Sequence, residues 1–172
     1  MSAPDTIRSA RPAITTALMA QTGLDDATLS RLVQVFYDRV RSDPLLGPVF
    51  AERITDWGGH LERMADFWSS VALMTGRYHG APMAMHLRLP LDGAHFDRWL
   101  HLFRQTAREL CPPAGADRVT ERAERIAAAI HTNIVQARGA SGDARSGDAR
   151  SENARSGNAR SGNAGRVPQL QE

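Results

Sequence analysis

Apolar side chains recur at helical spacing through most of the chain before residue 138. In the segment ATLSRLVQVFYDRVRSD, residues 27–43, spacings of three and four place an apolar stripe on one face of an α-helix. The stripe consists of Leu29, Leu32, Val33, Phe36 and Val40. Asp25 and Asp26 come just before it, and acidic residues suit a helix N-terminus. We therefore predict a long helix after Asp26, with Tyr37 at the edge of the apolar face and its ring turned inward.

The same reasoning predicts three further elements in the first half of the chain. A weak helix is expected over residues 14–19, ending at the turn-like pair Thr22-Gly23, and a very short one over residues 43–50, broken at Gly47-Pro48. A further helix is predicted to begin only at His60, because the glycines just before it weaken its first turn. Its inner stripe is His60, Met64, Phe67 and Val71.

The second half continues the helical pattern. We predict a short turn or helix over residues 83–87, ended by Pro90, and a helix from Asp92 or His95 to about residue 110. A last helix is expected over residues 117–135. No segment alternates apolar and polar residues as a strand would, so the predicted fold class is all-α.

The last part of the chain has a different composition. From Ala140 onward it repeats in fives, as SGDAR, SGDAR, SENAR, SGNAR and SGNAG, and this unit has no apolar face to bury. We predict disorder there. The expected organisation is an N-terminal extension with a weak helix over residues 1–24, a folded domain over 25–138 and a disordered tail over 139–172.

Composition removes several classes of function. All 21 basic residues are arginines, which excludes a phosphate-binding GxxxxGK[ST] loop and a Schiff-base lysine. A single cysteine excludes an intrachain disulfide, a CxxC zinc site and covalent CxxCH haem attachment. The net charge of +2 implies no strong field for nucleic acid. No run approaches ~20 apolar residues, and no signal sequence opens the chain, so we expect a cytoplasmic protein with no membrane contact.

His86 is the candidate metal ligand. It ends a short element in the context MAMHLRL, where apolar neighbours are expected to exclude water, namely Met83, Met85, Leu87 and Leu89. An apolar slot with one neutral imidazole is what a haem iron requires. The alternative is an ordinary, partly buried histidine, and composition alone favours that alternative.

Five motifs in order resemble the group III truncated haemoglobins. They are FYDRVRSDPLLGPVF, the W-x-x-H pair of Trp57 and His60, the pair Phe67-Trp68, GRYHGAP, and HLRLP followed by HFDRWLHLF. The resemblance covers about residues 26–135. It implies a truncated globin fold, with two helices packed over two, and a noncovalently held haem b.

The resemblance also implies roles for individual residues. His86 takes the position of the iron ligand, and Tyr37, His60 and Trp99 take the three positions that face a ligand on the other side of the haem. Donors there suit the partial negative charge of bound oxygen. The expected lining of the haem slot is Phe50, Met64, Phe67, Trp68, Phe96 and Ile130. Candidate partners of the propionates are Arg77, Tyr78 and Arg88, since arginine suits a carboxylate.

The implied function is reversible binding of oxygen or another diatomic ligand. Three distal donors hold a ligand too firmly for delivery, which points to redox chemistry with oxygen, nitric oxide or peroxide. Such turnover, nitric oxide dioxygenase-like or peroxidase-like, needs a reductase partner, which the sequence does not identify.

Two alternatives from other classes remain at this point. The first is a helical bundle with non-haem iron, suggested by the pairs Asp56 with His60 and Asp92 with His95. Glycine lies inside both pairs, so these aspartates are expected to cap helices instead. The second is a cofactor-free interaction module.

Overall fold

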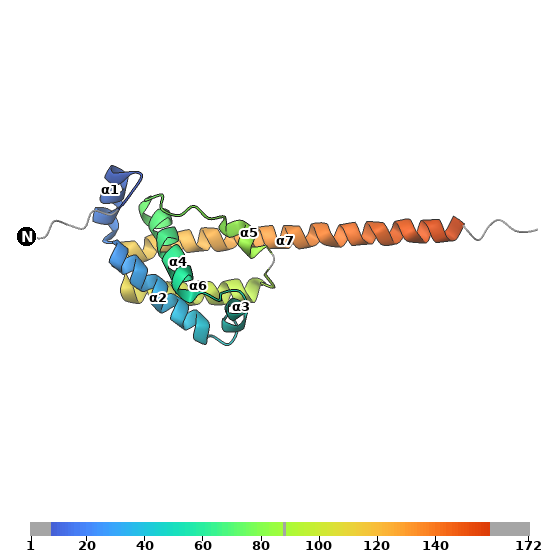
Figure 1. Cartoon of the computed structure of the whole chain (residues 1–172), viewed down its shortest axis with the longest axis horizontal. Coiled ribbons are helices and arrows are strands. Elements are labelled where there is room, and N and C mark those ends of the chain that lie inside the picture. The colour runs from blue at the N-terminus through green and yellow to red at the C-terminus, as the bar shows by residue number, and fades with distance from the viewer. Residues whose placement is uncertain (1–7, 88, 159–172) are drawn as a thin grey trace, which may run out of the picture. The chain divides into compact units, whose positions relative to one another are not determined.

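The described part of the chain is helical throughout. The computed structural model describes residues 8–87 and 89–158, without the side chains of Met83 and of residues 141–158, and these residues form helices and no strand (Figure 1). The helices are α1 Pro12–Thr22, α2 Asp26–Ser42, α3 Gly47–Ala51, α4 Trp57–Leu73, α5 Pro82–His86, α6 Gly93–Leu110 and α7 Pro113–Asn158. The prediction of an all-α fold is confirmed.

α2 is the central helix of the main core. The Asp25 side chain caps it by accepting a hydrogen bond from the Thr28 N–H at 2.7 Å. The predicted apolar stripe and Tyr37 are all buried, and α2 packs against both α4 and α6 (Figure 1). The first part of α7 contributes Val119 and Ala123 to the same core.

α1 is a complete helix rather than the short, weak one expected. It ends at Gly23, which adopts φ +68° and donates its N–H to Met19 O at 2.8 Å. Its buried residues are Thr15 and Thr22, whereas Ile14 is 44% exposed. Contacts with α4, together with the packing of Leu18 and Met19 against the main core, therefore stabilise α1.

α3 begins where we predicted a break. Proline needs no N–H partner in the first turn, so Gly47-Pro48 starts this helix and residues 44–46 form a turn before it. The buried carboxylate of Asp43 organises the turn. It accepts hydrogen bonds from the N–H groups of Leu45 and Leu46, both at 3.0 Å, and from Arg98 Nε at 2.6 Å.

α4 also starts earlier than predicted, at Trp57 instead of His60. The Asp56 side chain accepts a hydrogen bond from the Gly59 N–H at 3.0 Å, and this cap compensates for the two glycines in the first turn. As a result, His60 lies inside a formed helical turn.

α5 and α6 follow the predictions closely. α5 covers residues 82–86, and the Asp92 side chain and His95 form a capping box at the start of α6. α6 ends before Cys111, the single cysteine of the chain, which is buried. Burial raises the pKa of the Cys111 thiol to about 11.

The last helix is longer than predicted. The expected end near residue 135 is wrong, because α7 continues to Asn158. The boundaries of the folded domain and the disorder of the tail stay predictions. No proline interrupts the repeats before Asn158, although their serine, glycine, aspartate and asparagine are poorer helix formers than their alanine and arginine. Residues 159–172 lie outside the described part. The chain separates into two compact units, Met1–Ile134 and Val135–Glu172.

None of the helices in the described residues is long and apolar enough to cross a membrane.

Candidate functional site

A largely apolar cavity of about 240 Å³ lies inside the first unit. Its walls come from α2, α4, the loop after α4, α5, α6 and the first part of α7. The lining consists of Tyr37, Leu46, Phe50, His60, Arg63, Met64, Phe67, Trp68, Tyr78, Pro82, Met85, His86, Leu91, His95, Phe96, Trp99, Ile126, Ala127 and Ile130. With the exception of Arg77, every candidate site residue of the sequence analysis that the structure describes belongs to this lining.

His86 lines the cavity, and one of its ring nitrogens is hydrogen-bonded to the backbone. Its Nδ1–H donates to the carbonyl oxygen of Pro82, one helical turn earlier, at 2.6 Å. This hydrogen bond fixes the ring and leaves the lone pair on Nε2. Histidines that bind metals are held in the same way, by a hydrogen bond at the nitrogen that does not ligate.

Tyr37, His60 and Trp57 form a group of rings beside the cavity. The Tyr37 and His60 rings meet edge to face, with centroids 5.0 Å apart, and the Trp57 ring lies 5.8 Å from His60 and 6.1 Å from Tyr37. Arg41 covers Trp57, with its guanidinium carbon 4.6 Å from the ring centroid. The three rings therefore pack against one another.

Two polar groups in this region have no protein partner. His60 Nε2 is buried without a hydrogen bond. Among the residues whose side chains the structure describes, none is hydrogen-bonded to the hydroxyl of Tyr37, which lines the cavity. A buried polar atom without a partner, such as His60 Nε2, is uncommon in native proteins. Its position beside an apolar cavity is consistent with a partner supplied by a ligand.

Burial and charge keep both groups neutral. Burial lowers the pKa of His60 below its ordinary value, and the positive charge of Arg63 lowers it further. Burial, with a smaller effect of Tyr78, raises the pKa of Tyr37. At neutral pH Tyr37 therefore keeps its proton and can donate a hydrogen bond.

Trp99 comes from α6 and lies against the aromatic core. Its ring is 5.2 Å from Phe36 and stacks on Phe103 at 5.3 Å. These contacts fix the indole at the cavity wall, where the predicted Phe96 and Ile130 also lie.

Arg77 is not among the residues that line the cavity. Its guanidinium forms a two-pronged pair with Asp26, at 2.7 and 2.8 Å, and Nε lies 3.1 Å from Asp66. Two carboxylates from α2 and α4 therefore hold it away from the site. Arg88 lies outside the described residues, so its predicted role stays a prediction.

Arg63 was missed by the sequence analysis. It is exposed and lines the cavity, three residues after His60 on the same face of α4. The helical spacing from His60 could have identified it.

Part of the expected apolar shield around His86 is absent. Met85 is 74% exposed and Leu87 is 38% exposed, so these two side chains do not exclude water as predicted. α5 has only five residues and lies at the surface, where one side of a short helix must face solvent.

The aspartates of the two proposed iron pairs cap helices, as expected. Asp56 and Asp92 accept hydrogen bonds from the backbone N–H groups of Gly59 and His95. Across the described ranges, no three His, Cys, Asp or Glu side chains gather to hold a metal ion. A non-haem-iron bundle thus has no ligand set in this part of the chain.

Comparisons with known proteins agree with this geometry. The family profile of the bacterial-like globins matches residues 18–132. The group 3 truncated hemoglobin ctb of Campylobacter jejuni is 30% identical over 109 residues, which are 60% of this chain and 86% of that protein. The group 2 truncated hemoglobin YjbI of Bacillus subtilis is 33% identical over 79 residues, 45% of this chain and 60% of that protein.

The fold shows the same likeness. A crystal structure of the group III truncated hemoglobin from Campylobacter jejuni superimposes with a TM-score of 0.61 at 29% identity, covering 64% of this chain and 91% of that one.

Proposed function

Because the chain belongs to the bacterial-like globin family, we propose that it holds haem b noncovalently in this cavity and reversibly binds oxygen or another diatomic ligand there. Globins are haem proteins that bind small ligands, and this coarser function follows from the family. The observation that carries the finer proposal is the pair of histidines on one apolar cavity. His86 is hydrogen-bonded so that Nε2 is free, and His60 Nε2 is buried without a partner.

The cavity suits haem in its chemistry. A flat macrocycle fits between aromatic and aliphatic walls such as Phe67, Phe96 and Ile130. His86 would hold the iron, and the exposed Arg63 replaces Arg77 as our proposed partner of a propionate. When bound, haem supplies an iron centre that binds diatomic molecules and exchanges electrons.

The chain's own residues would retain the ligand rather than release it. Tyr37 and Trp99 present O–H and N–H donors, and His60 contributes a third polar group beside them. A carrier must release its cargo, so this arrangement supports redox chemistry with oxygen, nitric oxide or peroxide. We propose nitric oxide dioxygenase-like or peroxidase-like turnover in the cytoplasm, with electrons from a reductase partner that remains to be identified.

Haem titration of His86→Ala tests the iron ligand. Wild-type protein should develop a Soret band at one haem per chain, and the variant should lose the band or shift it to that of a weakly held iron. His101→Ala is the matched control, because His101 is an exposed histidine outside the cavity lining. A wild-type protein that takes up no haem would contradict the proposal. A spectrum of His86→Ala identical to that of the wild type would show that His86 is not the iron ligand.

The redox role has its own test. Oxygen-loaded protein is mixed with nitric oxide in one series and with excess deoxymyoglobin in another. We expect reaction with nitric oxide to outpace transfer of oxygen to the acceptor. Transfer of oxygen to deoxymyoglobin that is faster than the reaction with nitric oxide would instead favour a role in oxygen delivery.

A further inference from the structure

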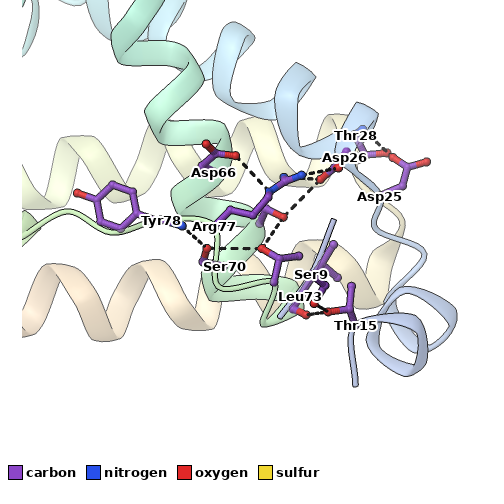
Figure 2. Close-up of polar contacts among 12 residues, drawn as sticks. Ser9, Thr15, Asp25, Asp26, Thr28, Asp66, Ser70, Leu73, Arg77 and Tyr78 are labelled. Atoms are coloured by element: carbon purple, nitrogen blue, oxygen red, sulfur yellow. Dashed lines mark hydrogen bonds and ion pairs between the residues drawn. The ribbon is translucent and has the colours of Figure 1, made fainter. Parts of the chain in front are cut away.

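The segment before α1 contacts the loop that follows α4. The Ala10 N–H donates to Thr75 O at 2.8 Å. Thr15 Oγ1 donates to Leu73 O at 2.9 Å (Figure 2). Ser9 Oγ lies 2.7 Å from Thr15 Oγ1. Residues 9–15, which we call the strap, therefore join the C-terminal end of α4 to the start of the loop.

The strap completes the hydrogen bonding of a helix end. The last carbonyls of a helix have no partner within it. At the end of α4, Ala72 O accepts from Arg118 Nε at 2.5 Å, and Leu73 O accepts from Thr15. Thr15 is only 2% exposed, so loss of its hydroxyl would leave a buried carbonyl unsatisfied.

Hydroxyl groups continue these contacts from the strap toward Tyr78. Thr75, which is buried, has its Oγ1 3.1 Å from Ser69 Oγ and 3.5 Å from Ser70 Oγ. Ser70 Oγ in turn accepts a hydrogen bond from the Tyr78 N–H at 2.9 Å (Figure 2). Arg77, which lies between Thr75 and Tyr78 in the sequence, binds Asp26 and Asp66 (Figure 2). The loop is therefore fixed at several successive residues.

The loop ends in the wall of the cavity. The Tyr78 ring lines the cavity and meets the Phe67 ring edge to face at 5.1 Å. A Cβ on Gly80 would lie 2.2 Å from the Tyr78 hydroxyl oxygen, so the absence of a side chain there makes room for this ring. Two residues further, Pro82 starts α5 and supplies the carbonyl that orients His86.

We propose that Thr15 is a positioning residue, through which the strap holds the loop of residues 74–81, and with it Tyr78 and Pro82, in place against the haem. The strap lies before residue 18, where the match to the globin family begins, so it is a device of this chain outside the matched region. The inference rests on the proposed haem binding. Its consequence is slower loss of haem than the cavity alone would give.

The test compares Thr15→Val with Thr16→Val, a matched control because Thr16 is the neighbouring residue and is exposed. Haem-loaded protein is mixed with excess apomyoglobin, and transfer of haem is followed by absorbance. Thr15→Val should speed haem loss about fivefold or more, as expected for a buried carbonyl left unsatisfied. In the protein without haem, amide hydrogen exchange of residues 75–78 should also accelerate in Thr15→Val and stay unchanged in Thr16→Val.

The outcomes separate this inference from the proposed function. A wild-type protein that binds no haem would overturn both. Normal haem binding with equal haem loss in the two variants would overturn the strap alone, as would faster amide exchange without faster haem loss.

If Thr15→Val does not fold, Ser70→Ala tests the same connection at its other end by removing the acceptor of the Tyr78 N–H. Ser42→Ala is then the control, since Ser42 bonds only within α2. Equal haem loss from Ser70→Ala and Ser42→Ala would overturn the strap.

Discussion

Tyr37 combines a buried ring with a hydroxyl that no described protein group satisfies. Its raised pKa keeps the proton on the oxygen over the whole physiological range. A protonated hydroxyl beside an apolar cavity is a hydrogen-bond donor whose acceptor must come from a bound molecule.

Tyr37→Phe should therefore speed the release of oxygen by about tenfold or more, because a buried hydrogen bond to a charged acceptor is worth about 1.5–3 kcal/mol. Trp99→Phe should act in the same direction. Stopped-flow measurement of the oxygen dissociation rate checks both. Rates equal to the wild type in both variants would remove the argument from distal donors.

Asp43 makes the stability of the fold depend on pH. Burial raises the pKa of its carboxyl, but hydrogen bonds from Leu46, Arg98 and Leu45 outweigh burial and bring the pKa below its ordinary value. The stabilisation is therefore complete above the unfolded pKa of about 3.9 and is lost as pH falls through the lowered folded value.

We expect Asp43→Asn to lower the free energy of unfolding by about 1–3 kcal/mol at neutral pH, and the difference to shrink below about pH 4. Urea unfolding at a series of pH values measures it. Asp38→Asn is a suitable control, since Asp38 is exposed and its ion pair with Arg41 spans 3.9 Å. A difference that persists at low pH would contradict this account.

At the residue scale, the sequence predicted the residues that line the cavity better than the arginines near its edge. His86 and Tyr37 follow from motifs whose order and spacing carry the resemblance, and the structure brings them to one cavity. Arg77 and Arg63 could not be distinguished in the same way. The partner of a surface arginine depends on which carboxylates the fold brings near, and here Asp26, 51 residues away in sequence, binds Arg77.

At the scale of elements, replacing glycine by alanine is expected to change the stability of the protein in opposite directions at two positions. Gly23 ends α1 at φ +68°, and a Cβ there would lie 2.9 Å from Pro112 Cγ. Gly58 lies inside α4, where a Cβ would meet only an ordinary contact with Asp56 at 3.6 Å.

Gly23→Ala should destabilise the protein by about 1–2 kcal/mol, since the left-handed conformation is costly for alanine. Gly58→Ala should stabilise it by about 0.5–1 kcal/mol, because alanine loses less entropy in a helix. Thermal unfolding of both variants beside the wild type provides the comparison. Shifts of the same sign in the two would contradict the assigned backbone conformations.

The apolar face of α2 was predictable, whereas the starts of α3 and α4 were not. The stripe of α2 defines a buried face by spacing alone. The starts of α3 and α4 depend instead on single caps. Asp56 compensates for the glycines after it, and Asp43 organises the turn before Gly47-Pro48. These side-chain bonds reverse what the residue propensities indicate.

At the scale of the whole molecule, the cavity and the family match both end before residue 135. The last lining residue is Ile130, and the match to the globin family stops at residue 132. The second compact unit begins at Val135. The repeats that make up most of it have no apolar face to bury.

Removing residues 140–172 should therefore leave haem uptake and the thermal midpoint unchanged. Titration with haem and thermal unfolding of the shortened chain measure the two quantities. A lower haem affinity would show that the repeats contribute to the site, contrary to the expectation from their sequence.

The buried thiol of Cys111 allows local opening of the protein to be measured from the rate at which the thiol is alkylated. With a pKa of about 11 and a side chain enclosed at the end of α6, it is almost inert to alkylating reagents while the protein stays closed. Since it is the single cysteine of the chain, every labelled molecule has opened at one known place. The labelling rate then gives the opening equilibrium directly, before and after haem is added, in a protein that carries no probe and no substitution.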